Sequence, residues 1–296
     1  MRIKNRIVPL IGIMSLAALL MAGCEKKPEY AEASPDIADS FPLQAEPADN
    51  PQLIESDGPY AILHTTAGDI KILLYPEQAP KAVENFIGLA KEGYYDGSLF
   101  YYAKSDDLTE TGKPKPADPE VAERSFWDDP FEDELDNGLY NFRGAVGMSG
   151  GSMGRDSNLS RFYLLVKDEI PEDERIIPAS CYVGELKMKG LRGLDEMALE
   201  KELTQEEVDQ YVAGINDEIN AIPTDGIPEE LAPKFAPVAE RYGEVGGAWG
   251  LDYKNTVFGQ IVEGLNVAEG ITQVKVSAEN RQPKKDVVIE SIEIIE

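Results

Sequence analysis

The segment from Gly144 to Leu165 constrains the fold of this chain more than any other segment. It opens on an apolar run, passes through a stretch of Gly, Ser, Arg, Asp and Asn, and ends on a second apolar run. This pattern predicts two buried strands joined by an irregular loop of small residues. A loop held between buried strands is where a rigid scaffold commonly presents a site. We therefore expect a β-rich domain with a functional site beside this loop.

Length and charge narrow the class of protein. The chain has 296 residues and a formal net charge of -27, which admits either two domains or one domain with an insertion. Phosphate binding needs clusters of Lys and Arg, and the part expected to fold has no extended cluster, so we expect no nucleic-acid partner. Two cysteines, Cys24 and Cys181, are too few for a disulfide framework.

The first 24 residues predict an export signal. Basic residues precede an apolar run over residues 7–20, which is shorter than the roughly 20 residues that cross a bilayer. The sequence Met-Ala-Gly-Cys that ends at Cys24 resembles the lipobox of bacterial lipoproteins, which implies a lipidated Cys24. The alternative is a plain signal peptide with an incidental cysteine. We expect an extracytoplasmic protein anchored to the cell membrane, or to the outer membrane if the cell has one.

Residues 25–59 predict a disordered tether. Proline recurs among Glu, Asp, Ala and Ser with little apolar periodicity, so the segment cannot bury enough surface to offset its ordering entropy. We place the folded domain at residues 60–296. Its only histidine, His64, lies in an expected strand and has no companion, so we assign it no catalytic role.

The folded domain opens with a predicted hairpin and a helix. Residues 61–64 and 70–75 are β-rich runs joined by a short turn. Pro80 suits a first helical turn, the apolar residues that follow have helical spacing, and Gly93 is a fitting stop.

Residues 79–100, APKAVENFIGLAKEGYYDGSLF, resemble the amino-terminal half of the cyclophilin-type peptidyl-prolyl isomerases. Residues 255–267, NTVFGQIVEGLNV, are similar to a late strand of that family, and residues 286–295 resemble its closing strand. The resemblance covers residues 60–166 and 245–296. It implies a mainly β fold, a closed eight-stranded antiparallel barrel with two capping helices. An inserted α-helical subdomain would occupy about residues 167–244.

The resemblance also implies an isomerase of peptidyl-prolyl bonds. Rotation about such a bond faces a barrier of about 20 kcal/mol, so the catalyst must bind the twisted bond better than either planar form. An apolar pocket for the proline ring and a hydrogen-bond donor aimed at the imide nitrogen suffice, and we expect no cofactor and no metal. The expected partners are proline-containing segments of exported proteins, and we expect a monomer.

The catalytic positions depart from the family pattern. The family's donor is an arginine two residues after a strand phenylalanine, here Phe100, and Tyr102 stands in its place. Glu110 stands at the glutamine that supports this arginine. Loss of one preorganised donor typically lowers a rate by about 10²- to 10³-fold, so we expect weak activity.

Other positions carried over from the family would contact the substrate. Tyr163 replaces a family phenylalanine and Asn255 a family histidine. Arg161 is either a second donor or, as we favour, the partner of an acid such as Asp156 or Glu110. The predicted substrate-binding set is Phe100, Leu108, Met148, Ser149, Arg161, Phe162, Tyr163, Leu251 and Asn255.

The predicted insertion is strongly acidic, with 19 acidic against 8 basic residues in 167–241. Thr204 and Glu207 form a capping-box pattern ahead of a helical apolar face. A second helix between Pro228 and Tyr242 should be interrupted by its prolines. The insertion reads equally as a client surface and as a solvated elaboration.

Three functions remain open from the sequence. The leading hypothesis is an isomerase that assists the folding of exported proteins. The first alternative is a catalytically inactive proline-peptide-binding or chaperone-like module, which the missing arginine favours. The second alternative is an adhesin-like or scaffolding lipoprotein that uses the acidic insertion.

Overall fold

The computed structural model describes residues 51–52, 57–114, 122–135, 137–150, 156–168, 182–187, 190, 193–194, 197–198, 201, 203–222 and 232–295. Cys24, the predicted signal and residues 25–50 and 53–56 of the predicted tether lie outside these residues. Contacts divide the chain into two compact units, one taking in residues 45–188 and 223–296 and the other residues 189–222. Over the described ranges, no helix has the length and apolar character needed to cross a bilayer.

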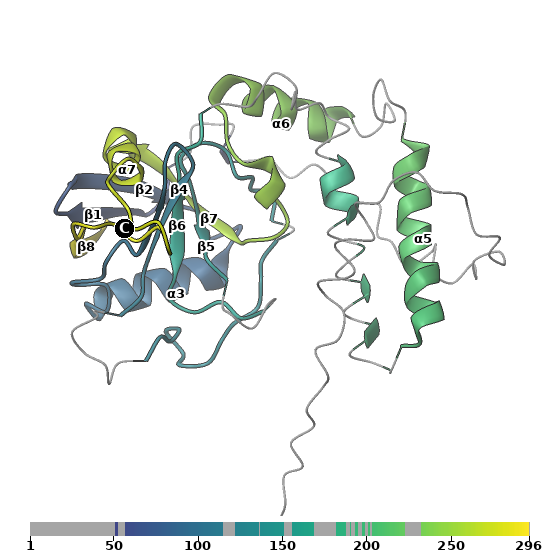
Figure 1. Cartoon of the computed structure of the whole chain (residues 1–296), viewed down its shortest axis with the longest axis horizontal. Coiled ribbons are helices and arrows are strands. Elements are labelled where there is room, and N and C mark those ends of the chain that lie inside the picture. Colours follow the sequence, from purple (N-terminus) through teal and green to yellow (C-terminus); the bar gives the residue numbers. More distant parts are fainter. Residues whose placement is uncertain are drawn as a thin grey trace, which may run out of the picture. The chain divides into compact units, whose positions relative to one another are not determined.

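Eight antiparallel strands form one sheet in the larger unit, in the order β3-β4-β6-β5-β7-β2-β1-β8 (Figure 1). Strand neighbours in this order are often distant in sequence, so the sheet joins the first and last thirds of the chain. The strands are β1 (Tyr60–Thr65), β2 (Gly68–Leu74), β3 (Tyr102–Lys104), β4 (Leu108–Thr111), β5 (Ala145–Met148), β6 (Phe162–Leu165), β7 (Val257–Glu263) and β8 (Ile289–Ile295).

The sheet is curled but not fully closed, which corrects the expectation of a closed barrel. Its two edge strands, β3 and β8, are linked through the segments that precede them, by one bridge between Leu99 and Val288. The amide of Phe100 donates to the Val287 carbonyl at 3.0 Å, and the amide of Ala103 donates to Arg281 at 3.0 Å. Because β3 has only three residues, these few bonds replace a continuous ladder.

The predicted hairpin of β1 and β2 is confirmed, with Thr65 paired to Gly68 across a two-residue turn. His64 lies on β1, where its Nδ1 is 2.9 Å from Asp69 and its Nε2 is 3.6 Å from Glu293. The hydrogen bond to Asp69 is the main cause that raises the pKa of this imidazole. His64 therefore has a structural role between two strands.

Ordered contacts begin before Tyr60, within the segment expected to be a tether. The side-chain amide of Gln52 accepts a hydrogen bond from the Tyr140 amide at 2.8 Å and donates to the Tyr140 carbonyl at 2.9 Å. The carbonyl of Pro59 accepts from the Leu74 amide at 2.9 Å. These residues belong to the folded unit because they satisfy backbone groups of the sheet and its loops.

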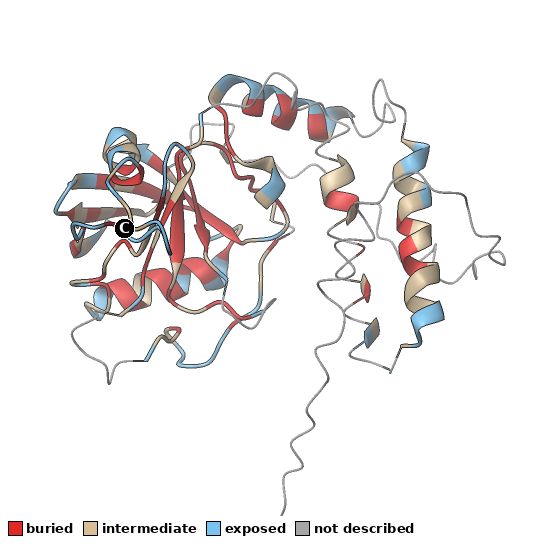
Figure 2. Cartoon of the chain, in the orientation of Figure 1, coloured by how far each residue is buried: buried red, intermediate tan, exposed pale blue. Residues whose placement is uncertain are grey.

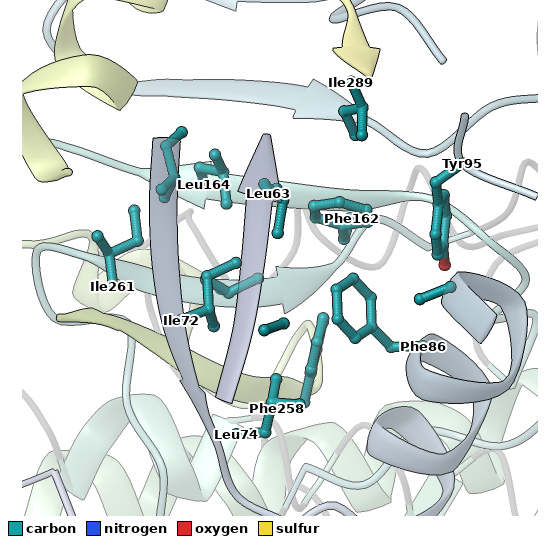
Figure 3. Packing of buried hydrophobic residues seen from close by; sticks show 14 of the residues in the cluster. Leu63, Ile72, Leu74, Phe86, Tyr95, Phe162, Leu164, Phe258, Ile261 and Ile289 are labelled. Carbon is teal, nitrogen blue, oxygen red and sulfur yellow. The ribbon is translucent and has the colours of Figure 1, made fainter. Parts of the chain in front are cut away.

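Helix α3 (Pro80–Lys91) supplies one wall of the interior, as its sequence pattern predicts. Pro80 lies in the first turn, and Gly93 follows the helix with a φ of +69°. Phe86 projects from the helix into the interior of the curled sheet, where its ring lies edge-on to Phe162 at 5.4 Å (Figure 3). Helix α7 (Leu265–Thr272) packs against β2, so two helices cover the sheet as expected.

Helix α5 (Gln205–Ala221) belongs to the smaller unit. Both halves of its predicted capping box are present, since the Thr204 side chain accepts from the Glu207 amide and the Glu207 carboxylate accepts from the Thr204 amide. One face is buried, at Tyr211, Val212 and Ile215 (Figure 2). The predicted helix and its inward face are confirmed.

Helix α6 (Ala232–Val245) belongs to the larger unit and runs through Pro237 without a break. The expected interruption is wrong, because Pro233 lies in the first turn, where no intrahelical donor is needed, and Pro237 removes only one bond. Phe235 and Val238 are buried as predicted. They pack in an aromatic cluster with Tyr140, Phe142 and Tyr242.

Candidate functional site

Strands β4, β5 and β6 carry two sets of side chains that face opposite sides of the sheet. Successive residues of a strand point to opposite faces, so the parity of a position decides what its side chain contacts. Phe162 and Leu164 of β6 belong to the interior cluster with Phe86 and Phe258. Tyr163 and Leu165 belong to a second cluster on the other face, which we call the outer face.

Three residues predicted to contact substrate lie in the interior instead. Phe100 and Met148 are 1% exposed and Phe162 is 0% exposed, and all three belong to the cluster around Phe86. Strand parity directs Met148 and Phe162 to the interior, and Phe100 is buried in the same cluster just before β3. We correct their assignment from substrate binding to core packing.

Tyr163 lies on the outer face, with Leu108 and Ala248 packed against its cluster. It is 3% exposed, and its hydroxyl donates to Asn141 Oδ1 at 2.5 Å. A Cβ at Gly147 would meet the Tyr163 hydroxyl at 2.2 Å, so only glycine lets the ring lie across β5. Burial is the main cause that raises the pKa of Tyr163. This phenol therefore stays neutral and acts as a donor.

The two predicted catalytic positions lie opposite each other. Tyr102 on β3 pairs in register with Glu110 on β4, and both side chains are half-buried. The Glu110 carboxylate already accepts two hydrogen bonds from neighbouring residues. Its Oε2 accepts from the Tyr101 hydroxyl at 2.7 Å and from Ser149 Oγ at 3.0 Å. Within the described residues, no hydrogen bond involves the Tyr102 hydroxyl.

Tyr101 is a site residue that the sequence analysis missed. Burial raises the pKa of its phenol and the adjacent Glu110 carboxylate adds to this effect. The ammonium group of Lys113 lies 3.9 Å from the centre of its ring. The backbone amide of Tyr101 donates to the Glu110 carbonyl at 3.0 Å. This pairing lies just before β3 and is irregular, so the strict alternation of side chains along a strand could not predict it.

Arg161 pairs with an acid, as we favoured, but the partner is Glu123. The distance from Arg161 Nε to Glu123 Oε1 is 2.7 Å, and Arg161 Nη2 donates to the Gly150 carbonyl at 3.1 Å. Both side chains are largely covered, with 16% of the Arg161 side chain and 24% of the Glu123 side chain exposed. A guanidinium held in this way is a weaker candidate for a free donor.

The remaining two predicted residues lie on the segment that leads to β7. Leu251 ends the short helix η2 (Trp249–Leu251) and is half-buried. Asn255 donates from Nδ2 to the Met148 carbonyl at 3.0 Å, so it fixes the end of β5. The candidate site is the set of half-buried residues Tyr101, Tyr102, Leu108, Glu110, Ser149, Arg161, Leu251 and Asn255, together with the buried Tyr163.

This site holds hydroxyl, amide and guanidinium groups beside apolar side chains, and the Asn255 amide and the Arg161 guanidinium already donate within the protein. A hydroxyl or guanidinium can donate to a developing lone pair on an imide nitrogen, and Leu108 and Leu251 can contact a proline ring. Among the described residues, no cluster of His, Cys, Asp or Glu could hold a metal ion.

Comparison with known proteins places the chain in a family. The family model for the cyclophilin type peptidyl-prolyl cis-trans isomerase matches residues 60–212 and 245–294. The match thus continues past Val166, where our sequence resemblance ends. A Staphylococcus epidermidis protein named "Putative peptidyl-prolyl cis-trans isomerase" is 31% identical over 235 residues, which are 79% of this chain and 91% of that protein.

Two further relatives differ more in length or sequence. A Streptococcus pyogenes protein, whose name pairs this isomerase with a phosphatase, is 32% identical over 81% of this chain and 39% of its own length. A cyclophilin type isomerase of Cryptosporidium parvum, crystallised in the presence of the dipeptide Ala-Pro, has 16% identity and a TM-score of 0.49. That similarity covers 80% of this chain and 99% of the other. The family match spans more than half of the sequence, and the chain belongs to the cyclophilin-type peptidyl-prolyl cis-trans isomerases.

Proposed function

We propose that the protein binds proline-containing segments of exported proteins and isomerises them with low efficiency. The observation that carries this proposal is the cross-strand pair of Tyr102 and Glu110. These are the positions at which the family resemblance implies an arginine and its supporting glutamine. Tyr102 is half-buried on β3, and the apolar residue Leu108 lies on the neighbouring strand β4, so the hydroxyl of Tyr102 is the proposed donor.

The low efficiency follows from the chemistry of the available donors. A neutral hydroxyl forms weaker hydrogen bonds than a guanidinium, because hydrogen bonds with a charged donor are roughly twice as strong. Arg161 carries the right charge, but its guanidinium already donates hydrogen bonds to Glu123 and to the Gly150 carbonyl. The proposed site therefore keeps the apolar contacts and one weak donor.

The test uses the chain without its first 24 residues and measures isomerisation of a proline tetrapeptide. We expect a wild-type rate above the uncatalysed rate and a gain of about 10- to 100-fold for Tyr102→Arg, because the guanidinium would face Glu110. Tyr102→Lys is the matched control, since it adds the same charge without the planar fork of donors. We expect little gain from it.

The inactive binding module is the second candidate, and the engagement of Arg161 by Glu123 favours it. Wild-type activity at background, with tetrapeptide binding retained and activity gained only in Tyr102→Arg, would establish this alternative. Absence of both binding and activity in every variant would instead favour the adhesin-like or scaffolding hypothesis.

We also propose that lipidated Cys24 holds the domain at the extracytoplasmic membrane surface. The motif that ends at Cys24 and the proline-rich residues after it support this proposal. Cys24→Ser should move the protein from the membrane fraction to the soluble extracytoplasmic or secreted fraction. Cys181→Ser is the matched control, and an unchanged distribution of Cys24→Ser would contradict the anchor.

A further inference from the structure

A buried polar network lies directly behind the candidate site, with Asn141 at its centre. Asn141 is 0% exposed, and every polar group of its side chain is used. Its Oδ1 accepts from the Tyr163 hydroxyl at 2.5 Å. Its backbone amide and its Nδ2 both donate to Asp252 Oδ1, at 2.8 and 3.0 Å.

Asn141 also forms hydrogen bonds with the residues at both ends of helix η2. The Asn141 carbonyl accepts from the amide of Ala248, the residue before the helix, at 2.8 Å. Asp252, the residue after the helix, receives the two Asn141 donors described above. The helix is closed internally by the Leu251 amide, which donates to Ala248 at 2.8 Å. The position of Leu251 in the site is therefore set through Asn141.

The network continues into helix α6. Tyr242 is 0% exposed and donates from its hydroxyl to Asp252 Oδ2 at 2.6 Å. Its ring packs against Phe142 with centroids 4.6 Å apart. A Cβ at Gly247 would lie 2.3 Å from the Asn141 carbonyl, so glycine is needed where the chain returns from α6 to η2. The inserted helix is thus bonded to the residues behind the site.

The network is stiff because its buried polar groups have hydrogen-bond partners. A buried donor or acceptor that loses its partner costs far more than an exposed one, so each member resists displacement of the others. Tyr163 and Leu251 reach the site from β6 and η2, and their separation depends on the chain of bonds between them. A shift at Tyr242 is transmitted to both through Asp252.

We propose that Asn141, Asp252 and Tyr242 are positioning residues that hold Tyr163 and helix η2 in the peptide-binding arrangement, which makes helix α6 of the insertion part of the site's support. This inference rests on the proposed function for the identity of the ligand. The network itself is a separate claim and is tested separately.

The experiment uses Tyr242→Phe in the full chain, because this change removes one buried hydrogen bond and keeps the ring. We expect the dissociation constant for a proline tetrapeptide to rise by roughly three- to tenfold. We also expect amide hydrogen exchange at Ala248 and Leu251 to accelerate by a similar factor, since those bonds open more often. Retention of kcat with a raised KM would accompany both changes, because Tyr242 does not touch the substrate.

Tyr253→Phe is the matched control. The Tyr253 hydroxyl also donates to a carboxylate beside α6, Glu185 at 2.7 Å, but that carboxylate has no bond to Asn141 in the part of the chain that the structure describes. We expect a similar loss of thermal stability with unchanged exchange at Ala248 and Leu251 and unchanged peptide affinity.

The outcomes separate the two claims. Equal exchange in Tyr242→Phe and Tyr253→Phe would overturn the network, and altered exchange with unaltered peptide affinity would overturn its role in positioning. If the wild-type chain binds no proline peptide, the proposed function fails, and the exchange comparison alone decides whether the network holds η2.

Discussion

Asp252 is a buried carboxyl group behind the candidate site. It accepts hydrogen bonds from Asn141 and Tyr242, yet burial outweighs them and raises its pKa to about 7. The charge of Lys254 also lowers this pKa, by less than burial raises it. The folded protein therefore holds a proton on Asp252 at pH values where the unfolded chain, with an ordinary pKa of 3.8, has released it.

This shift predicts how stability depends on pH. A raised pKa in the folded state contributes stability below about pH 4 that is lost as the pH rises through about 7. Asp252→Asn mimics the protonated acid, so its free energy of unfolding should rise relative to wild type between about pH 4 and pH 7 and stay level above that. Urea denaturation across this range measures the difference.

Glu84→Gln is a suitable control for this prediction, because Glu84 is an exposed acid on α3. It should keep a constant offset from wild type over the same range. A constant offset for Asp252→Asn as well would show that Asp252 does not hold its proton near neutral pH.

Individual residues also show how far sequence could predict the site. The resemblance singled out Tyr102 and Glu110 as the catalytic positions, and the structure pairs these two residues across β3 and β4. It could not separate Phe162 from Tyr163, because contact with substrate depends on which face of β6 each occupies. Asn141 and Asp252 had no sequence signal, since their bond joins residues 111 positions apart.

At the scale of elements, helix α6 shows how tertiary packing overrides local preference. Pro237 removes one backbone hydrogen bond, which alone argues against a continuous helix. Phe235, Val238 and Tyr242 are nevertheless buried on one face, and burial of three large side chains offsets the defect. Helix propensity alone predicted a break in the helix at its prolines. That argument does not include the packing of these side chains. The start and the buried face of helix α5 were predictable, because the helix has both a cap and an apolar face.

The defect in α6 gives a prediction of its own. Pro237 is exposed, so Pro237→Ala should restore the bond to the residue 233 carbonyl without loss of packing. We expect the free energy of unfolding to rise by about 1–3 kcal/mol, measured by chemical denaturation. Pro233→Ala, in the first turn, should change it by less than about 0.5 kcal/mol. Equal effects of the two substitutions would mean that the helix is not continuous at Pro237.

At the scale of the whole molecule, the strand order could be anticipated only through family resemblance. Periodicity predicts strands such as β1 and β2 and their hairpin, but the pairing of β5 with β7 joins residues more than a hundred positions apart. The incomplete closure had no local signal either, because it depends on the three-residue length of β3. The insertion likewise proved to be divided, with α5 in one compact unit and α6 in the other.

Because the sheet does not close, the outer edge of β8 needs another protection against pairing with a strand of a second molecule. Beyond Ile289, the described hydrogen bonds of this strand run to β1 on one side. An uncovered edge is a template on which a strand from another molecule can add. Glu290 and Glu293 are exposed along this strand, and a second copy would bring the same charges to the new pairing. Mutual repulsion of identical acidic edges therefore opposes fibre-like self-assembly where the ladder ends.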